Sequence, residues 1–544
     1  MAESRSALWK VVVGAIVLVL LVTLYQTFKS RKGDESAAAL RIAIETEPER
    51  LDPLTVKNPK TFLILMQIYE GLLGLDETGR IVPAIAERWE SADNGLTWRF
   101  AIRKNARFHE SPIFGGAKSR PITSEDVAWS LSAVCGPGSY PAFVLSDAIQ
   151  GCADYGAGKA KDVSGIKVVD GSTVEVTLIK PEAFFPYRLT TGWIAVLPRE
   201  MTAPENKDKW GLSIAVGSGP YRLVSSSDSE VVLAANDAYW DSTRVPQIKK
   251  LVYRVIKNDQ LRIAEMDKGA IDLMPLSVPM LPVFLDGPRK IKPVMADRYA
   301  FKEAQIYNTN LLGFNLNVVK DVHLRRAMFY GVDRKAIVEK LLYGYGDAMA
   351  GAAPPGMNGF QPSFKMDAIF DVERAKQELA KSTYAGEEIE LFVHDLGGSE
   401  QIGQIFQDQM KSIGVKVKLN KLDMNGVIGR IIKGDAPMFS MFLDYVFSSP
   451  ELVLLNLFPS SKRPVPNFWQ YSSPEADARL ERLRTMTGEA AVRESAQVEA
   501  LIMEDVPALF LFRQITLVAH SKRLTKLSIN GHGHYQFERA ALAQ

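Results

Sequence analysis

Asp444 is the side chain whose type and position most clearly indicate chemistry. It lies in the segment MFLDYVFSSPE, residues 441–451, where an apolar strand gives way to a loop. A carboxylate at such a position is unusual, because burying an unpaired charge is costly. Asp444 is therefore a candidate binding residue, and the simpler alternative is an aspartate that caps the following loop.

Familiar catalytic motifs are absent from the sequence. It contains no H-E-x-x-H zinc motif, no Walker loop, no dinucleotide fingerprint and no G-x-S-x-G elbow. The histidines form one cluster, Gly531-His-Gly-His534, for which a nickel or copper site is one interpretation. Two exposed histidines in a C-terminal loop are the simpler interpretation. We therefore predict a protein that is not an enzyme and that holds no metal or cofactor.

The elements that must position such a site carry strong local signals. Leu96, Trp98, Phe100 and Ile102 alternate with polar or small residues, which is typical of a strand with one buried face. Asn94-Gly95 precedes this strand and predicts a tight hairpin turn, with residues 85–91 as the partner strand. Residues 123–126, TSED, have the form of a helix capping box.

A second set of signals predicts a βαβ unit further along the chain. Residues 389–393 read as a strand, and residues 399–413 as a helix that ends at Gly414. Val415, Val417 and Leu419 alternate with lysines in the returning strand. A parallel sheet with a right-handed crossover is expected. Two further helices, at 321–331 and 333–342, each begin with an aspartate suited to the N-cap.

Size and charge restrict the class of protein. The chain has 544 residues, so two or three domains are expected. Residues 1–32 carry five basic residues and one acidic residue, whereas the rest of the chain carries 60 basic and 62 acidic residues. A nearly neutral body argues against nucleic acid as the main partner.

The N-terminus contains a run of 15 almost wholly apolar residues, VVVGAIVLVLLVTLY, from Val11 to Tyr25. Trp9 to Phe28 is about the length that crosses a bilayer as a helix. We predict an uncleaved transmembrane anchor at residues 9–28. A cleaved signal peptide is the alternative, but the nearest small-residue cluster lies well beyond the run. The flanking charges leave the orientation of this helix open.

Cys135 and Cys152 are the two cysteines of the chain. In an oxidising compartment they could form one disulfide, which would contribute about 3 kcal/mol for a loop of this size. Two buried free thiols are the alternative.

The stretch from Tyr69 to Trp129 resembles a known family. It reads YEGLLGLDETGRIVPAIAERWESADNGLTWRFAIRKNARFHE, then a glycine-rich insertion, then PITSEDVAW. It is similar to the N-terminal lobe of family 5 extracellular solute-binding proteins, the oligopeptide- and dipeptide-type receptors of ABC importers. Further similar segments occur in the family's order. LDP at 51–53 precedes this stretch, and after it come GSGPY at 217–221, NDAYW at 236–240, KGAID at 268–272, LGFNLN at 312–317, NFWQYSSPEADARL at 467–480 and EDVP at 504–507.

The resemblance implies an α/β fold with two lobes, like periplasmic binding proteins of type II in the large cluster C form. It implies a cytoplasmic stub at residues 1–8, the anchor at 9–28 and a linker at 29–40. Lobe I is expected at 41–306 plus 515–544, with an accessory subdomain at about 61–190, and lobe II at 307–514. The body is then expected outside the cytoplasmic membrane, in the cell envelope.

The resemblance also implies a function and a site. The chain is expected to capture peptides or amine-bearing, peptide-like solutes and to deliver them to an ABC permease with its ATPase. In peptide-binding members, the aspartate that matches Asp444 pairs with the free α-amine of the ligand. The other residues expected in the substrate site are Tyr445, Met441, Tyr140, Phe143 and Trp469, although core packing is an alternative for Trp469 and loop packing for Tyr140 and Phe143.

The sequence departs from the family at two places. Met438 and Met441 stand where some oligopeptide receptors carry an arginine and a tryptophan. A more apolar cleft is therefore expected. The cysteine of a lipid anchor is also missing. A receptor or scaffold without transport, an envelope hydrolase on the same fold, and a nickel complex or an oligosaccharide as the ligand stay open as alternatives.

Overall fold

The computed structural model describes residues 39–58, 60–362, 364 and 369–543. The predicted anchor at 9–28 lies outside these residues, as do the predicted stub at 1–8 and nearly all of the linker. In the described part of the chain, none of the helices combines the length and the apolar character needed to span a bilayer.

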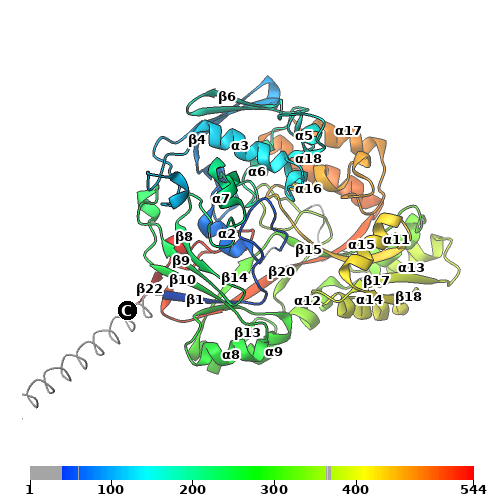
Figure 1. Cartoon of the computed structure of the whole chain (residues 1–544). Helices are drawn as coiled ribbons and strands as arrows, with labels where there is room; N and C mark the ends of the chain where they lie inside the picture. Colours follow the sequence, from blue (N-terminus) through cyan, green and yellow to red (C-terminus); the bar gives the residue numbers. More distant parts are fainter. Residues whose placement is uncertain (1–38, 59, 363, 365–368, 544) are drawn as a thin grey trace, which may run out of the picture.

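One mixed sheet of twelve strands runs through the molecule (Figure 1). Its central strand, β20 (Ala508–His520), is 13 residues long. The first half of β20 pairs with β15 (Asn308–Phe314), and the second half pairs with β14 (Ala300–Gln305) and β11 (Leu273–Pro275). The chain therefore folds into two lobes that share this strand.

Lobe I is built around the half of the sheet that contains β14 and β11. Its remaining strands are β1 (Ala39–Ile44), β8 (Tyr221–Ser226), β9 (Glu230–Ala235) and β10 (Lys250–Val255). β1 pairs in parallel with β10 and β11, whereas β8, β9 and β10 are antiparallel neighbours.

Lobe II has the predicted βαβ arrangement. The chain passes from β17 (Glu388–His394) through α14 (Ser399–Ile413) to β18 (Lys416–Leu422), and then through α15 (Met424–Lys433) to β19 (Met438–Asp444). The three strands are parallel, so their carboxyl ends meet at one edge of the sheet. The prediction for α14 is confirmed, and Gly414 ends it in the left-handed conformation with a φ of 91°.

Lobe II contains several further helices. Asp321 and Asp333 cap α11 (Val322–Gly331) and α12 (Arg334–Leu342), as predicted. The remaining helices are α13 (Val372–Lys381), α16 (Pro450–Leu457), α17 (Pro474–Leu483) and α18 (Gly488–Glu504). The family-like segment at 312–317 is strand only as far as Phe314, where β15 and its pairing with β19 end.

A separate four-stranded antiparallel sheet lies outside the twelve-stranded sheet, and we call the segment built on it, residues 86–188, the accessory subdomain. Its strands, in spatial order, are β4 (Ala86–Ala92), β5 (Thr97–Ile102), β7 (Thr173–Thr177) and β6 (Ile166–Asp170). The predicted hairpin is confirmed: Asn94 and Gly95 have φ values of 58° and 87° between β4 and β5. The capping box also forms, at the start of α3 (Ser124–Cys135).

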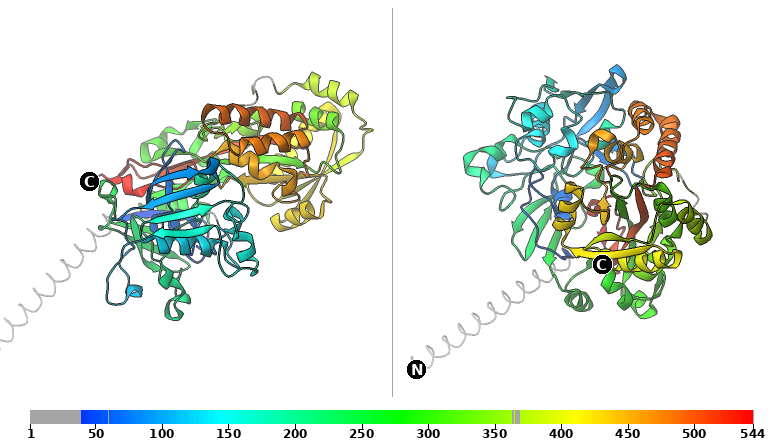
Figure 2. Two further views of the ribbon diagram at one scale, coloured as in Figure 1. Left: turned by 90° about the horizontal axis from the view of Figure 1, so that it is seen from above. Right: turned by 90° about the vertical axis from the view of Figure 1, so that its right-hand side faces the viewer.

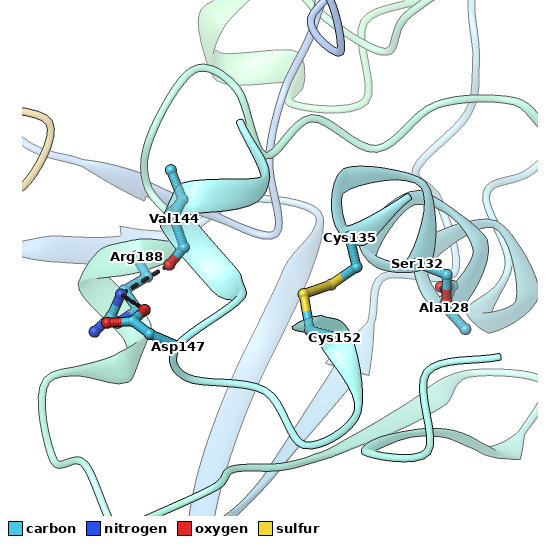
Figure 3. The surroundings of a disulfide bond; sticks show 7 residues. All are labelled: Ala128, Ser132, Cys135, Val144, Asp147, Cys152 and Arg188. Carbon is cyan, nitrogen blue, oxygen red and sulfur yellow. Dashed lines mark hydrogen bonds and ion pairs between the residues drawn. A yellow bond between two sulfur atoms is a disulfide. The ribbon is translucent and has the colours of Figure 1, made fainter. Parts of the chain in front are cut away.

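A disulfide joins Cys135, at the end of α3, to Cys152, at the start of α5 (Cys152–Gly156) (Figure 3). Both cysteines are buried. The bond closes the loop of residues 136–151, which contains the short helix α4 (Ala142–Leu145). This disulfide loop therefore has both of its ends fixed to the core of the accessory subdomain.

The accessory subdomain also contacts lobe II. The backbone N–H of Ala183 donates to the carbonyl oxygen of Arg484 at 2.8 Å. Near this contact lie α6 (Phe185–Arg188) on one side and α16, α17 and α18 on the other (Figure 1). In a second view, the yellow and orange segments of lobe II lie to one side of the blue and cyan segments of lobe I (Figure 2).

Candidate functional site

Asp444 is the last residue of β19, at the edge where the carboxyl ends of the lobe II strands meet. Ligands of α/β proteins bind at such edges. The side chain has open surface, yet protein surrounds it closely enough that burial raises the pKa of Asp444, against the opposing charge of Lys60. Asp444 thus combines a side chain that is open to water with protein atoms close around it. Among the described residues, none forms an ion pair with it.

The backbone around Asp444 is held by the strands that cross between the lobes. Asp444 lies opposite Asn308 in the β15–β19 pair. The side chain of Asn308 accepts from Gln514 N at 2.8 Å and donates to Gln514 O at 3.2 Å, which ties the start of β15 to β20. The N–H of Tyr445 donates to Tyr307 O at 2.9 Å. The backbone position of Asp444 is thus held by β15 and, through Asn308, by β20.

Three aromatic side chains of lobe I, Tyr140, Phe143 and Trp193, form a group that we call the aromatic wall. Their ring centroids are 5.7 to 6.1 Å apart. Tyr140 and Phe143 are 39% and 47% exposed, so they present apolar surface to solvent. The sequence did not single out Trp193, because its place beside Tyr140 depends on contacts between distant segments.

The segment around Val56, Lys57 and Lys60 connects the aromatic wall with Asp444. The indole N–H of Trp193 donates to Val56 O at 3.1 Å, and Lys57 Nζ lies 5.7 Å from the centre of the Tyr140 ring. Lys60, at the other end, is the cation whose charge acts on Asp444. The segment from Val56 to Lys60 therefore contacts the aromatic wall at one end and acts on Asp444 by charge at the other.

Three of the expected site residues do not offer a surface to a ligand in this structure. Trp469 is 0% exposed and stacks on Phe458, with ring centroids 5.6 Å apart. Met441 is 5% exposed, and the Tyr445 hydroxyl donates to Ala352 O at 2.6 Å inside the core. For Trp469, the structure favours the alternative of core packing.

The prediction of a more apolar cleft gains no support from Met438 and Met441. Met438 is fully buried and pairs with Phe314, at the opposite end of β19 from Asp444. Strands covered on both faces are apolar throughout. The sequence of β19 therefore does not reveal which of its side chains reach the cleft.

The expectation of two exposed histidines at the C-terminus is wrong. His532 and His534 are partly buried, and burial lowers the pKa of His532 to about 4 and that of His534 to about 3. The His532 ring lies edge-on to Tyr307, with centroids 5.5 Å apart. Within the described residues, no group of three or more histidine, cysteine or acidic side chains could hold a metal ion.

Lobe II also has a recess with a volume of about 580 Å³. Asn315, Lys433 and Arg463 are among its lining residues. Asn315 follows the Phe314 end of β15, whereas Asp444 lies opposite Asn308 at the other end. Six residues of strand, roughly 20 Å, separate the two places. The recess is therefore not part of the region around Asp444.

Comparison with known proteins identifies the family. The family model described as "Bacterial extracellular solute-binding proteins, family 5 Middle" matches residues 80–464. The oligopeptide-binding protein OppA of Bacillus subtilis is 24% identical over 541 residues, which cover 94% of each chain. The dipeptide-binding protein of Escherichia coli is 24% identical over 535 residues, which cover 93% of this chain and 95% of that protein.

A solved structure agrees with this result. HbpA2 from Haemophilus parasuis is 21% identical, and its structure superimposes with a TM-score of 0.79 over 93% of this chain and 100% of that chain. The likeness shows the two-lobed α/β fold of periplasmic binding proteins. The chain therefore belongs to the bacterial extracellular solute-binding proteins of family 5, a family of binding proteins rather than enzymes.

Proposed function

We propose that this protein binds peptides or peptide-like, amine-bearing solutes between its lobes, with Asp444 as the partner of the ligand's ammonium group. The observation that carries the proposal is the state of this carboxylate. It is open to water, its pKa is raised by burial, and none of the described residues pairs with it. A bond between an ammonium group and a carboxylate in a closed cleft is worth about 1.5–3 kcal/mol.

The aromatic wall is proposed to contact the apolar side chains of the ligand. Tyr140 and Phe143 keep much of their surface open, although both pack against Trp193. Aromatic surfaces of this kind bind varied apolar groups, because ring contacts depend on area and shape more than on the identity of the group. Lys60 would then lie near the bound ammonium and carboxylate, where it limits the number of positive charges that a ligand can carry.

We propose that the bound protein delivers its ligand to an ABC permease and its ATPase after hinge closure of the two lobes. Lobe II is assigned to residues 307–514, and lobe I to 41–306 and 515–544 with its accessory part at about 61–190. The pairing of β20 supports these limits, since its partner changes between Phe512 and Ile515. We further assign the fold to the type II, cluster C form.

The N-terminal segment is proposed to anchor the body to the membrane. Residues 9–28 would span the cytoplasmic membrane, with residues 1–8 inside and residues 29–40 as the linker to a body in the periplasm or outside the cell. Protease treatment of intact spheroplasts tests this topology: the body is expected to be digested from the outside, while a tag placed before residue 9 stays protected.

Calorimetry with a dipeptide and its N-acetyl form tests the site. Asp444→Asn should weaken binding of the free-amine dipeptide about tenfold or more, because the ammonium loses its partner. The acetylated dipeptide should bind equally weakly to both proteins. Asp423→Asn is a matched control, since Asp423 caps α15 directly after β18, another parallel strand of the same sheet that β17 separates from β19. Unchanged affinity in Asp444→Asn would contradict the assignment.

Mass spectrometry of ligand retained by the purified protein addresses the ligand class directly. An amine-bearing peptide in the native mass spectrum supports the proposal. A nickel complex or an oligosaccharide would replace it, and hydrolysis products of an added peptide library would indicate an enzyme on this fold.

A further inference from the structure

Arg188, at the end of α6, is a buried cation with an unusually complete set of partners. It is 5% exposed. Its Nε and Nη2 atoms donate to the two carboxylate oxygens of Glu182, at 2.6 and 3.1 Å. Its Nη1 atom donates to Val144 O at 2.8 Å and to Asp147 Oδ1 at 3.1 Å (Figure 3). One guanidinium group therefore holds Glu182 and two points of the disulfide loop.

The two points that Arg188 holds lie next to the aromatic wall. Val144 directly follows Phe143, and Tyr140 lies four residues before Val144 in the same loop. The disulfide fixes the ends of this loop, and Arg188 fixes its middle (Figure 3). The exposed rings of Tyr140 and Phe143 thus depend on Arg188 for their position.

Arg188 also contacts the loop that follows Asp444. Its guanidinium carbon lies 5.4 Å from the centre of the Phe447 ring, within the range of cation–π contacts. Phe447 is 5% exposed and lies three residues after Asp444. The same side chain therefore touches both halves of the proposed site, the aromatic wall in lobe I and the Asp444 loop in lobe II.

The two carboxylates that bind Arg188 are shared with cations of lobe II. Arg484 Nη1 donates to Glu182 Oε2 at 2.8 Å, and Lys462 Nζ donates to Asp147 Oδ2. Although burial opposes it, the combined charge of Arg188 and Lys462 lowers the pKa of Asp147. The contact between the lobes is thus an ion-pair network centred on Arg188.

We propose that Arg188 is a positioning residue that sets the aromatic wall of lobe I relative to the Asp444 loop of lobe II. The inference rests on the proposed function, because it concerns the same site. The alternative is a purely structural role, in which the buried ion pair only stabilises the accessory subdomain. The two interpretations differ in their effect on the contact between the lobes and on ligand affinity, which an ion pair internal to the accessory subdomain would leave unchanged.

The first test needs no ligand and uses the full chain. Hydrogen exchange is measured at the amide of Ala183, which donates to Arg484 O across the lobes. Arg188→Met should raise this exchange rate about tenfold, since a buried network that loses its centre opens locally. Arg188→Lys should restore little of the protection from exchange, because an ammonium group cannot reproduce the planar, bidentate geometry of a guanidinium group.

Arg334→Met is the matched control. Arg334 is 2% exposed, donates to Phe510 O at 2.8 Å and to Phe329 O at 3.0 Å, and lies 4.6 Å from the Phe329 ring. Its burial and ring contact resemble those of Arg188, but these partners all lie in lobe II. Arg334→Met should lower the melting temperature and leave exchange at Ala183 unchanged. Equal exchange in both variants would overturn the proposal.

The second test measures affinity for a free-amine dipeptide. Arg484→Met removes a lobe II partner without emptying the core, because the Arg484 side chain is 17% exposed. It should weaken binding about threefold to tenfold, with a steeper salt dependence in the wild type than in the variant. Unchanged affinity together with unchanged exchange would overturn the proposal.

The two tests separate two kinds of failure. If the wild type binds no amine-bearing ligand, the proposed function fails, whereas the exchange experiment still shows whether Arg188 couples the lobes. If the wild type binds the dipeptide and Arg188→Met binds it equally well while folded, the positioning role fails and the proposed function stands.

Discussion

Arg188 and Asp444 are two charged groups in neighbouring parts of the molecule, and they differ in burial and in pairing. Arg188 is almost fully buried and has a partner for each of its nitrogen atoms. Asp444 is open to water and has no ion-pair partner among the described residues. Phe447 connects them, because it lies three residues after Asp444 in the chain and its ring contacts Arg188.

The difference distinguishes a charge that holds the structure together from a charge that is available to a ligand. A buried charge is tolerated when hydrogen bonds and opposite charges satisfy it. The raised pKa of Asp444 shows that its ionised form is destabilised in the folded protein. Such a group stabilises the fold less than it would if paired, and this cost is typical of functional sites.

Among the changes to the Arg188 network, Glu182→Gln should cause the largest loss of stability. Glu182 is 2% exposed and binds both Arg188 and Arg484, so its loss leaves two cations without their shared carboxylate. We expect a loss of about 3–5 kcal/mol in the free energy of unfolding, measured by denaturant titration. Glu175→Gln, in an exposed pair with Arg99, is the control and should lose less than about 1 kcal/mol.

Removal of the disulfide should have the next largest effect. Cys135 and Cys152 are 17 positions apart, and a closed loop of this size contributes about 3 kcal/mol through the unfolded state. The double alanine variant should lose about this much in the same titration. Reductant should lower the stability of the wild type but not that of the variant. A reductant effect on the variant would show that another process is being measured.

Asp444→Asn should change stability in the opposite direction. The pKa of Asp444 is raised in the folded state, so its ionised form costs folding free energy above that pKa. The variant should therefore be more stable than the wild type near pH 7, and the gain should disappear as the pH falls below about 4, where both states bind the proton. Thermal unfolding across this range measures the difference; a loss of stability at neutral pH would mean that the carboxylate is paired.

The same protonation should affect ligand binding. As the pH falls through the raised pKa of Asp444, the carboxylate gains a proton and loses its attraction for an ammonium group. Affinity for a free-amine dipeptide should thus decline at a higher pH than for an ordinary aspartate, and affinity for the acetylated dipeptide should not. Calorimetry at several pH values measures both.

Lys462→Met should cause the smallest change in stability. The Lys462 side chain is 24% exposed, and surface ion pairs contribute about 0–1 kcal/mol. We expect a change in this range that vanishes in high salt, measured by denaturant titration at two ionic strengths. A larger, salt-independent loss would show that Lys462 is part of the core of the network rather than its edge.

Local signals in the sequence predicted many elements accurately. The helix at 399–413, the hairpin at Asn94-Gly95 and the capping box at residues 123–126 all formed as expected. Each depends on neighbouring residues: apolar spacing along one helix face, a turn that needs positive φ, and a side chain that bonds to its own backbone. The extent of β15 was less predictable, because its pairing with β19 determines where it begins.

At the candidate site, local signals in the sequence identify only some of the residues involved. Asp444 could be singled out because a carboxylate after an apolar strand is chemically unusual. Trp469 and Met441 are apolar residues whose sequence context does not distinguish a core position from a site position, and the structure places both in the core. Trp193 and Arg188 are important only through their contacts with Tyr140, Val144 and Phe447, which lie 44 to 259 positions away in sequence.

The sequence by itself thus determined the family, the type of fold and the one carboxylate that stands out, since these depend on residue types in a fixed order. Only the tertiary structure decided which charges are satisfied. Pairing depends on distances between groups from different lobes, and no local pattern encodes those distances. That is why Arg188 could not be recognised from its neighbours in the chain, whereas Asp444 could.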